Sequence, residues 1–311
     1  MGTEHIGEAV ARREGIENLV GAIAELSGSD RASVLMAVMA RAADSVRPTD
    51  VLRRHLDDRF VRPSNAHLSR LRAAEDRLLA GLGADVELVV LAPVVPFGTH
   101  RALGATPQDN VLTTTRGTEV AADPTNGLAL EAAARRRMLL SRQPRSSKAV
   151  DLGTCQRVIR GQRFSGPMSF SHFGLVARVT SGRDAGNYDF EVDAVVAHVD
   201  AWKRGLVACG IENVSVTLTD FSGHHRPTLE RIAAEVDATT DDERVRGRGY
   251  YDPICFQIDA LVGGRRVDIG DGGLVPWSSL LLSDAKERTM ISAIGVDRVA
   301  MLGAGRLDPG G

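Results

Sequence analysis

The chain has 311 residues, of which 43% are hydrophobic, and a formal net charge of −2. This size allows one large globular domain or two smaller ones with a sizeable core. The near-neutral charge argues against a protein that is held on nucleic acid by bulk positive charge. The three cysteines, Cys155, Cys209 and Cys255, form no Cys-x-x-Cys pair, so neither a zinc site nor a disulfide framework is indicated. The adjacent His224 and His225 predict no metal site either, because neighbouring side chains on a loop point apart.

The sequence predicts no membrane segment. It contains no run of 18 apolar residues, and its first residues lack the apolar core and cleavage site of a signal peptide. We therefore expect a cytoplasmic protein.

Residues 1–82 predict a helical extension. Apolar residues recur at helical spacing in segments that begin near Ile16, Asp30, Asp50 and Ser64, with Gly28 ending the first of them. Packing on the main domain and binding of a partner are both compatible with such an extension.

From residue 83 onward the pattern becomes mixed, which predicts a second domain at 83–311. The predicted strands span 86–92, 111–115, 119–122, 150–163, 170–180, 214–219, 254–262 and 265–269. The predicted helices span 128–140, 190–206 and 227–236. Short loops join several of the strands and favour antiparallel pairing, hence an α+β fold. The glycine-rich residues 270–273 are expected to form a tight turn.

Three stretches of this domain carry arginines in a recognisable order. They are Arg157-Val-Ile-Arg-Gly-Gln followed by Phe170-Ser-His-Phe, then Arg246-Gly-Arg-Gly-Tyr-Tyr, then Gly295-Val-Asp-Arg. They resemble motif 2, the Arg-Gly-x-x-Tyr-Tyr signature and motif 3 of histidyl-tRNA synthetases, which are class II aminoacyl-tRNA synthetases. The resemblance covers about residues 85–303 and implies an antiparallel sheet that binds ATP on one face, between arginines.

The resemblance implies roles for five residues. Arg160 falls on the arginine that binds the α-phosphate, and Arg298 on the one that binds the γ-phosphate. Arg246 falls on the arginine that contacts the α-phosphate in place of a metal ion. Phe170 falls on the phenylalanine that stacks on adenine, and Gln162 replaces a glutamate. The implied ligands are ATP and Mg²⁺.

The amino-acid pocket departs from the family pattern. Thr125 stands where the family has the glutamate that takes the substrate's amino group, and a hydroxyl cannot form an ion pair with an ammonium group. Tyr250 and Tyr251 belong to the matching signature, and His172 lies on the second strand of motif 2, so these three are expected near the substrate. The pattern argues against histidine and leaves another small carboxylate as substrate.

Pro93, in Leu91-Ala-Pro-Val-Val-Pro, resembles the proline at the dimer interface of class II enzymes. The resemblance therefore implies a homodimer.

Three functions remain open. The first is an adenylate-forming ligase that is not a complete tRNA synthetase. The second is a non-catalytic regulator that resembles the ATP phosphoribosyltransferase regulatory subunit, a paralogue that lacks the anticodon-binding domain, which this chain is also expected to lack after motif 3. The third is a tRNA-binding accessory protein, against which the net charge of −2 argues.

Overall fold

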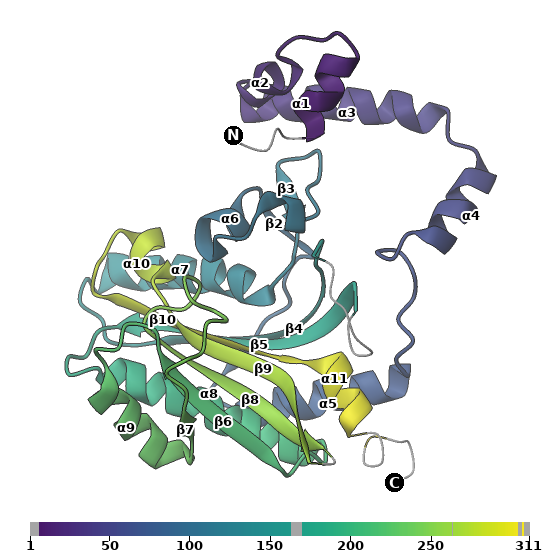
Figure 1. Ribbon diagram of the computed structural model, residues 1–311. Helices are drawn as coiled ribbons and strands as arrows, with labels where there is room; N and C mark the ends of the chain where they lie inside the picture. Colours follow the sequence, from purple (N-terminus) through teal and green to yellow (C-terminus); the bar gives the residue numbers. More distant parts are fainter. Residues whose placement is uncertain (1–5, 163–169, 263, 304–306, 308–311) are drawn as a thin grey trace.

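A mostly antiparallel sheet of eight strands forms the centre of the protein (Figure 1). The structure is a computed structural model that describes residues 6–162, 170–262, 264–303 and residue 307. The strand order is β1-β4-β5-β10-β9-β8-β6-β7. The two outermost pairs are parallel and the inner pairs are antiparallel. The strands are β1 (Glu87–Leu88), β4 (Val150–Ile159), β5 (His172–Arg183), β6 (Val214–Asp220), β7 (Thr239–Thr240), β8 (Ile254–Val262), β9 (Arg265–Val275) and β10 (Glu287–Gly295), and β2 (Val94–Pro96) pairs with β3 (Thr118–Val120) in a small second sheet.

Helices cover both faces of the sheet. The helices α5 (Leu68–Leu82), α8 (Asp189–Ala208), α9 (Arg226–Val236) and α11 (Val296–Leu302) contribute to the larger core cluster. The helices α7 (Pro124–Arg142) and α10 (Trp277–Leu282) cover the other face, and α6 (Thr99–Gly104) lies near them. The short η1 (Gln108–Asn110) follows α6 in the chain. Alternation along β8 supplies both layers, because Phe256 packs in the first core cluster and Cys255 in the second. The predicted α+β class is confirmed.

The N-terminal helices form an arm that extends from this body (Figure 1). They are α1 (Ile6–Arg13), α2 (Leu19–Ala24), α3 (Gly28–Asp44) and α4 (Pro48–Asp57). Helix α5 differs from them, because Leu71, Leu78 and Leu82 are buried in the larger core. We therefore propose that the boundary expected after residue 82 be drawn before α5. Within the described residues, no helix has the length and apolar character needed to cross a membrane.

Several predicted elements differ from those observed. Gly28 begins α3 instead of ending a helix, and Ser27 caps it by accepting a hydrogen bond from the Asp30 amide at 3.2 Å. Only Glu87–Leu88 of the predicted strand 86–92 is a strand, and residues 111–115 contribute one isolated bridge, Thr113 to Glu119.

The glycines 270–273 are the clearest correction, because they lie inside β9 and form no turn. A Cβ on Gly272 would lie 2.4 Å from the Ser292 Cβ of the adjacent β10. A Cβ on Gly270 would lie 2.4 Å from the Ala293 carbonyl oxygen. These glycines are needed for close strand packing, not for chain reversal.

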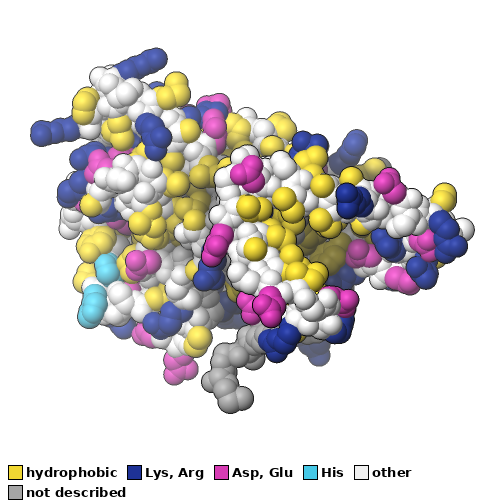
Figure 2. All heavy atoms as spheres, turned by 90° about the horizontal axis from the view of Figure 1, so that it is seen from above, with side chains coloured by type: hydrophobic (Ala, Val, Ile, Leu, Met, Phe, Trp, Pro, Cys, Tyr) yellow, Lys and Arg dark blue, Asp and Glu magenta, His cyan; other side chains and the backbone are white. Residues whose placement is uncertain are grey.

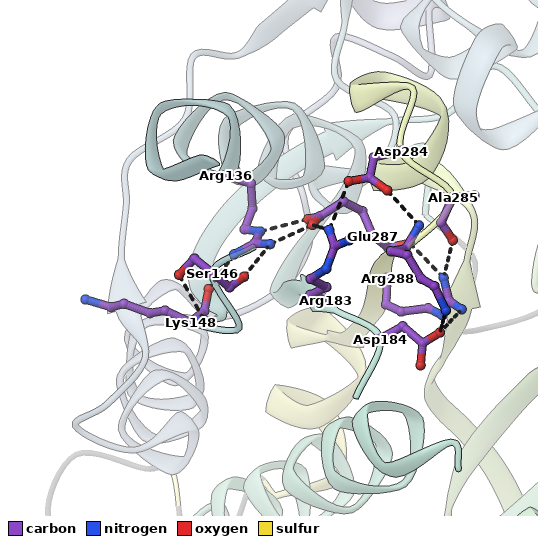
Figure 3. Close-up of polar contacts among 10 residues, drawn as sticks. Arg136, Ser146, Lys148, Arg183, Asp184, Asp284, Ala285, Glu287 and Arg288 are labelled. Atoms are coloured by element: carbon purple, nitrogen blue, oxygen red, sulfur yellow. Dashed lines mark hydrogen bonds and ion pairs between the residues drawn. The ribbon is translucent and has the colours of Figure 1, made fainter. Parts of the chain in front are cut away.

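A buried ion-pair network holds α7 to the start of β10 (Figure 3). The Arg136 guanidinium donates to both carboxylate oxygens of Glu287, at 2.8 and 2.6 Å, and both side chains are fully buried. The same guanidinium donates to the carbonyl oxygens of Ser146 and Lys148. Arg183 lies 3.6 Å from Glu287 and pairs with Asp284 at 2.9 Å.

Candidate functional site: an arginine-lined cleft

The three arginines of the sequence motifs line one cleft on the sheet. Arg160 follows β4, Arg246 lies in the loop before β8, and Arg298 lies in the first turn of α11 after β10. Strands β4, β5, β10 and β9 are consecutive neighbours, so residues at their ends converge although they are distant in sequence. Phe170 also lines the cleft, which is open to solvent.

Arg160 is held at the rim by backbone and side-chain contacts. Its Nε donates to the Ala122 carbonyl oxygen at 2.9 Å, and its guanidinium lies 3.3 Å from the Asp123 carboxylate. The guanidinium also lies over the Phe173 ring, 5.3 Å from the centroid. These contacts fix its orientation while leaving it on the cleft surface.

Arg246 and Arg298 share one carboxylate. Arg246 pairs with the Asp268 carboxylate, and the Arg298 guanidinium lies 3.7 Å from the same carboxylate. Arg298 also donates to the backbone carbonyl oxygen of Asp268 at 2.6 Å. The Arg246 side chain is 66% exposed. Both guanidiniums therefore face the cleft with their charge partly balanced by the protein.

A β-bulge brings two carboxylates to the same face of β9. Ile258 pairs with Gly270 and Asp259 with Asp268, so Ile269 is the extra residue. This shift in alternation lets Asp268 and Asp271, three residues apart, both line the cleft.

A second pocket adjoins the cleft and shares some of its wall. Asp123, Arg160, Arg246 and Asp271 line both cavities. The second pocket is further lined by Gln162, Asn126, Tyr250, Tyr251 and His100, among others. Its residues therefore surround a space beside the arginines, where a small molecule could meet a phosphate group.

The tyrosines of the signature present hydroxyl groups to the carboxylates of this pocket. Tyr251 donates to Asp271 at 3.0 Å, and the Tyr250 hydroxyl lies 3.5 Å from the Asp123 carboxylate. Burial raises the pKa of both tyrosines well above the usual value, so both remain neutral donors. Desolvation also raises the pKa of the Asp271 carboxyl group above its usual range.

Asn126 brings an unsatisfied donor to the pocket. Its Oδ1 accepts a hydrogen bond from His100 Nδ1 at 2.6 Å, while His100 Nε2 accepts one from the Ala122 amide at 3.1 Å. Asn126 is only 2% exposed, and its Nδ2 has no partner among the described residues. A buried amide of this kind calls for an acceptor, which a ligand could supply.

Arg244 is a buried residue that contacts the loop holding Arg246. It is 7% exposed, its Nε donates to the Arg246 carbonyl oxygen at 2.8 Å, and its guanidinium lies 3.6 Å from the Asp271 carboxylate. It therefore links the backbone of the Arg246 loop to the floor of the cleft.

Three other residues singled out in the sequence lie elsewhere. Thr125 is buried in the first turn of α7 and lines neither cavity. Its hydroxyl group donates a hydrogen bond to the Asp123 carboxylate at 2.7 Å. His172 also lines neither, since Arg157 Nε donates to its Nδ1 at 2.8 Å and its Nε2 donates to the Arg62 carbonyl oxygen at 2.6 Å. Pro93 is exposed between β1 and β2.

The sequence did not identify Asp123, Asn126 or Asp271 as site residues. Asp123 precedes a proline and a helix, which is the ordinary pattern of an N-cap. Asp271 lay among glycines expected to form a turn. Within the described chain, no group of three or more His, Cys, Asp and Glu side chains is placed to hold a metal ion.

No protein-family model matches the sequence, and no curated protein matches it. Solved structures do match the fold. Apo histidyl-tRNA synthetase of S. aureus has a TM-score of 0.56 at 14% identity, over 76% of this chain and 67% of that one. An ATP phosphoribosyltransferase regulatory subunit/histidyl-tRNA synthetase from Bacillus halodurans has a TM-score of 0.54 at 12% identity, over 77% and 79%. A histidine–tRNA ligase subunit from Alicyclobacillus acidocaldarius has a TM-score of 0.54 at 15% identity, over 79% and 96%.

The eight-stranded sheet, its flanking helices and these similarities agree with one another. The chain has the fold of a class II aminoacyl-tRNA synthetase catalytic domain, similar to that of histidyl-tRNA synthetases.

Proposed function

We propose that the protein binds ATP in the arginine-lined cleft and activates a small carboxylate as an acyl-adenylate. One observation carries this proposal: Arg160, Arg246 and Arg298, from three separate elements, line a single cleft together with Phe170. Guanidinium groups bind phosphate oxygens through paired donors, and an aromatic ring offers a stacking surface for a base.

For this reaction the protein mainly has to position the two substrates and stabilise the developing negative charge. A carboxylate oxygen of the substrate would form a bond to the α-phosphorus while the bond to the leaving pyrophosphate breaks. Charge that develops on the phosphate oxygens would be stabilised by Arg160 and Arg246, and Arg298 would hold the far phosphate. Mg²⁺ fits such a site, because it usually retains waters and takes one or two protein carboxylates beside the phosphates. Asp268 and Asp271 are the candidates.

The adjoining pocket suggests what kind of carboxylate is activated. Thr125 does not supply the negative charge expected at its position, but Asp123 and Asp271 line the pocket and do. A substrate with an ammonium group or other donor beside its carboxylate would complement them, and the free Asn126 amide would bind an acceptor. An amino acid or amino-acid analogue meets these requirements.

A regulatory role is the second candidate. Its support is the fold similarity to a structure named as an ATP phosphoribosyltransferase regulatory subunit/histidyl-tRNA synthetase. The pairing of Arg246 and Arg298 with Asp268 also fits it, because these arginines have partners without any phosphate.

Exchange of labelled pyrophosphate into ATP separates the two candidates. Screened over amino acids and their analogues, the ligase predicts exchange with at least one compound. Arg246→Ala should reduce that exchange by about 100-fold or more. Arg248→Ala is the matched control in the same loop, because its guanidinium donates to the Phe221 carbonyl oxygen and does not line the cleft. MgATP binding without exchange for any compound would favour the regulator.

A further inference from the structure

The segment that joins the arm to the body, residues 59–64, lies against the cleft. We call these residues the brace. Arg59 donates to the Gly161 carbonyl oxygen at 2.5 Å, to Ser171 Oγ at 3.2 Å and to the Gln162 carbonyl oxygen at 3.4 Å. One side chain therefore spans from the residues that follow β4 to the residue that precedes β5. The planar guanidinium makes this possible, since its donors are fixed in a fork.

Two further contacts continue the brace along the cleft. The Arg62 carbonyl oxygen accepts a hydrogen bond from His172 Nε2 at 2.6 Å. Ser64 Oγ donates to the Asp297 carboxylate at 3.4 Å, and Asp297 lines the cleft one residue before Arg298. The brace thus contacts the ends of β4 and β5 and the start of α11.

The residues held by Arg59 are immediate neighbours of the proposed nucleotide contacts. Gly161 and Gln162 follow Arg160, and Ser171 follows Phe170. The Arg160 amide itself donates to the Ser171 carbonyl oxygen at 3.2 Å. A shift of Ser171 relative to Gly161 would therefore move Arg160 and Phe170 apart.

We propose that Arg59 is a positioning residue for the nucleotide site, through which the N-terminal arm holds Arg160 and Phe170 in register. The inference rests on the proposed function, because it assigns Arg59 to the ATP cleft. Arg59 itself does not line that cleft. Its effect passes through the backbone of Gly161 and the hydroxyl of Ser171.

The test compares Arg59→Ala with Arg59→Lys and with Arg53→Ala in the full chain. Arg53 is the control on the same arm, because its side chain is 69% exposed and pairs with Asp50 in the arm itself. Isothermal titration with MgATP should show affinity roughly tenfold weaker for Arg59→Ala. Arg59→Lys should recover part of the loss, since an ammonium group can donate to a carbonyl oxygen but cannot reproduce the fork. Arg53→Ala should bind as the unchanged protein does.

Hydrogen exchange gives a second readout that needs no nucleotide. Arg59→Ala should accelerate amide exchange in the peptides that hold residues 156–162 and 170–176, and Arg53→Ala should not. Unchanged MgATP affinity in Arg59→Ala, or unchanged exchange at both peptides, would overturn the inference while leaving the ATP site standing. Failure of the unchanged protein to bind MgATP would instead overturn the proposed function, and with it the assignment of Arg59 to a nucleotide site.

Discussion

Asp268 controls how readily Arg246 and Arg298 could bind a phosphate group. Its carboxylate pairs with Arg246 and lies 3.7 Å from Arg298, so an incoming phosphate must share these guanidiniums with it or displace it. A bound Mg²⁺ would change this balance, because the metal ion could take Asp268 as a ligand. Without a metal ion, we expect Asp268 to oppose phosphate binding through like charge and through competition for the same donors.

We expect Asp268→Asn to strengthen binding of metal-free inorganic pyrophosphate several-fold. The change removes one negative charge that pairs directly with Arg246 and lies 3.7 Å from Arg298, and such an interaction is worth about 1 kcal/mol or more at a partly exposed site. Isothermal titration in the presence of a chelator measures it. Asp76→Asn, on the exposed side of α5, is the control for a bare change of net charge. Weaker pyrophosphate binding in Asp268→Asn would show that Asp268 orders the arginines and does not compete.

Among the site residues, some could be predicted from short sequence motifs. Arginines in recognisable motifs indicated Arg160, Arg246 and Arg298, which the structure places on one cleft. Asp123 gave no such signal, because an aspartate before proline reads as a helix cap. Asn126 was also missed, since its unsatisfied amide is visible only once its burial and partners are known.

Among the elements, runs of apolar and β-branched residues indicated most of the central strands. Strands β4, β5, β6 and β8 lie close to their predicted ranges, because each buries side chains on both faces of the sheet. Strand β9 was cut short at residue 269, because its glycines resemble a turn in sequence. The reversal between β8 and β9 was predicted in the right place, because the predicted ranges ended at residue 262 and resumed at residue 265, and Val262 pairs with Arg265.

The buried ion pair between Arg136 and Glu287 is expected to contribute strongly to the stability of the fold. Arg136→Met leaves the buried Glu287 with only the more distant Arg183, so the free energy of unfolding should fall by about 3–5 kcal/mol. The adjacent Arg135→Ala removes only partly exposed pairs with Glu87 and Glu131 and should cost about 1 kcal/mol or less. Urea unfolding of the two variants measures the difference. Equal losses would mean that burial of the Arg136 pair contributes nothing special to stability.

At the scale of the whole molecule, an apolar strip beside β1 and β2 remains exposed. Leu88 is 53% exposed, Phe97 is 49% exposed, and the Val90 side chain is exposed completely. Pro93 lies between them. Helix α3 approaches the same strip, because the Arg31 guanidinium lies 5.8 Å from the centre of the Phe97 ring. Apolar side chains also gather on the face seen in Figure 2, where the arm overlies the body. A strip of this kind is typical of an interface.

We propose a homodimer through this strip, and light scattering at micromolar concentration tests it. The unchanged protein should have twice the mass of one chain, and Val90→Asp should shift it towards the monomer by burying an unpaired charge at the interface. Val207→Asp places the same change on the exposed side of α8 and should leave the dimer intact. A monomeric unchanged protein would exclude the dimer under these conditions, and a Val90→Asp dimer would locate the interface elsewhere.

Isothermal titration of MgATP into the unchanged protein and into Arg298→Ala tests whether the arginine-lined cleft binds ATP. We predict saturable binding with a dissociation constant below about 1 mM, which corresponds to about −4 kcal/mol. Arg298→Ala should weaken it by about tenfold or more through loss of a charged hydrogen-bond donor. Arg226→Ala, with a side chain 72% exposed on α9, should bind as the unchanged protein does. Absence of binding to the unchanged protein at millimolar MgATP would mean that the cleft is not an ATP site. Equal affinity in Arg298→Ala would mean that ATP does not bind through Arg298.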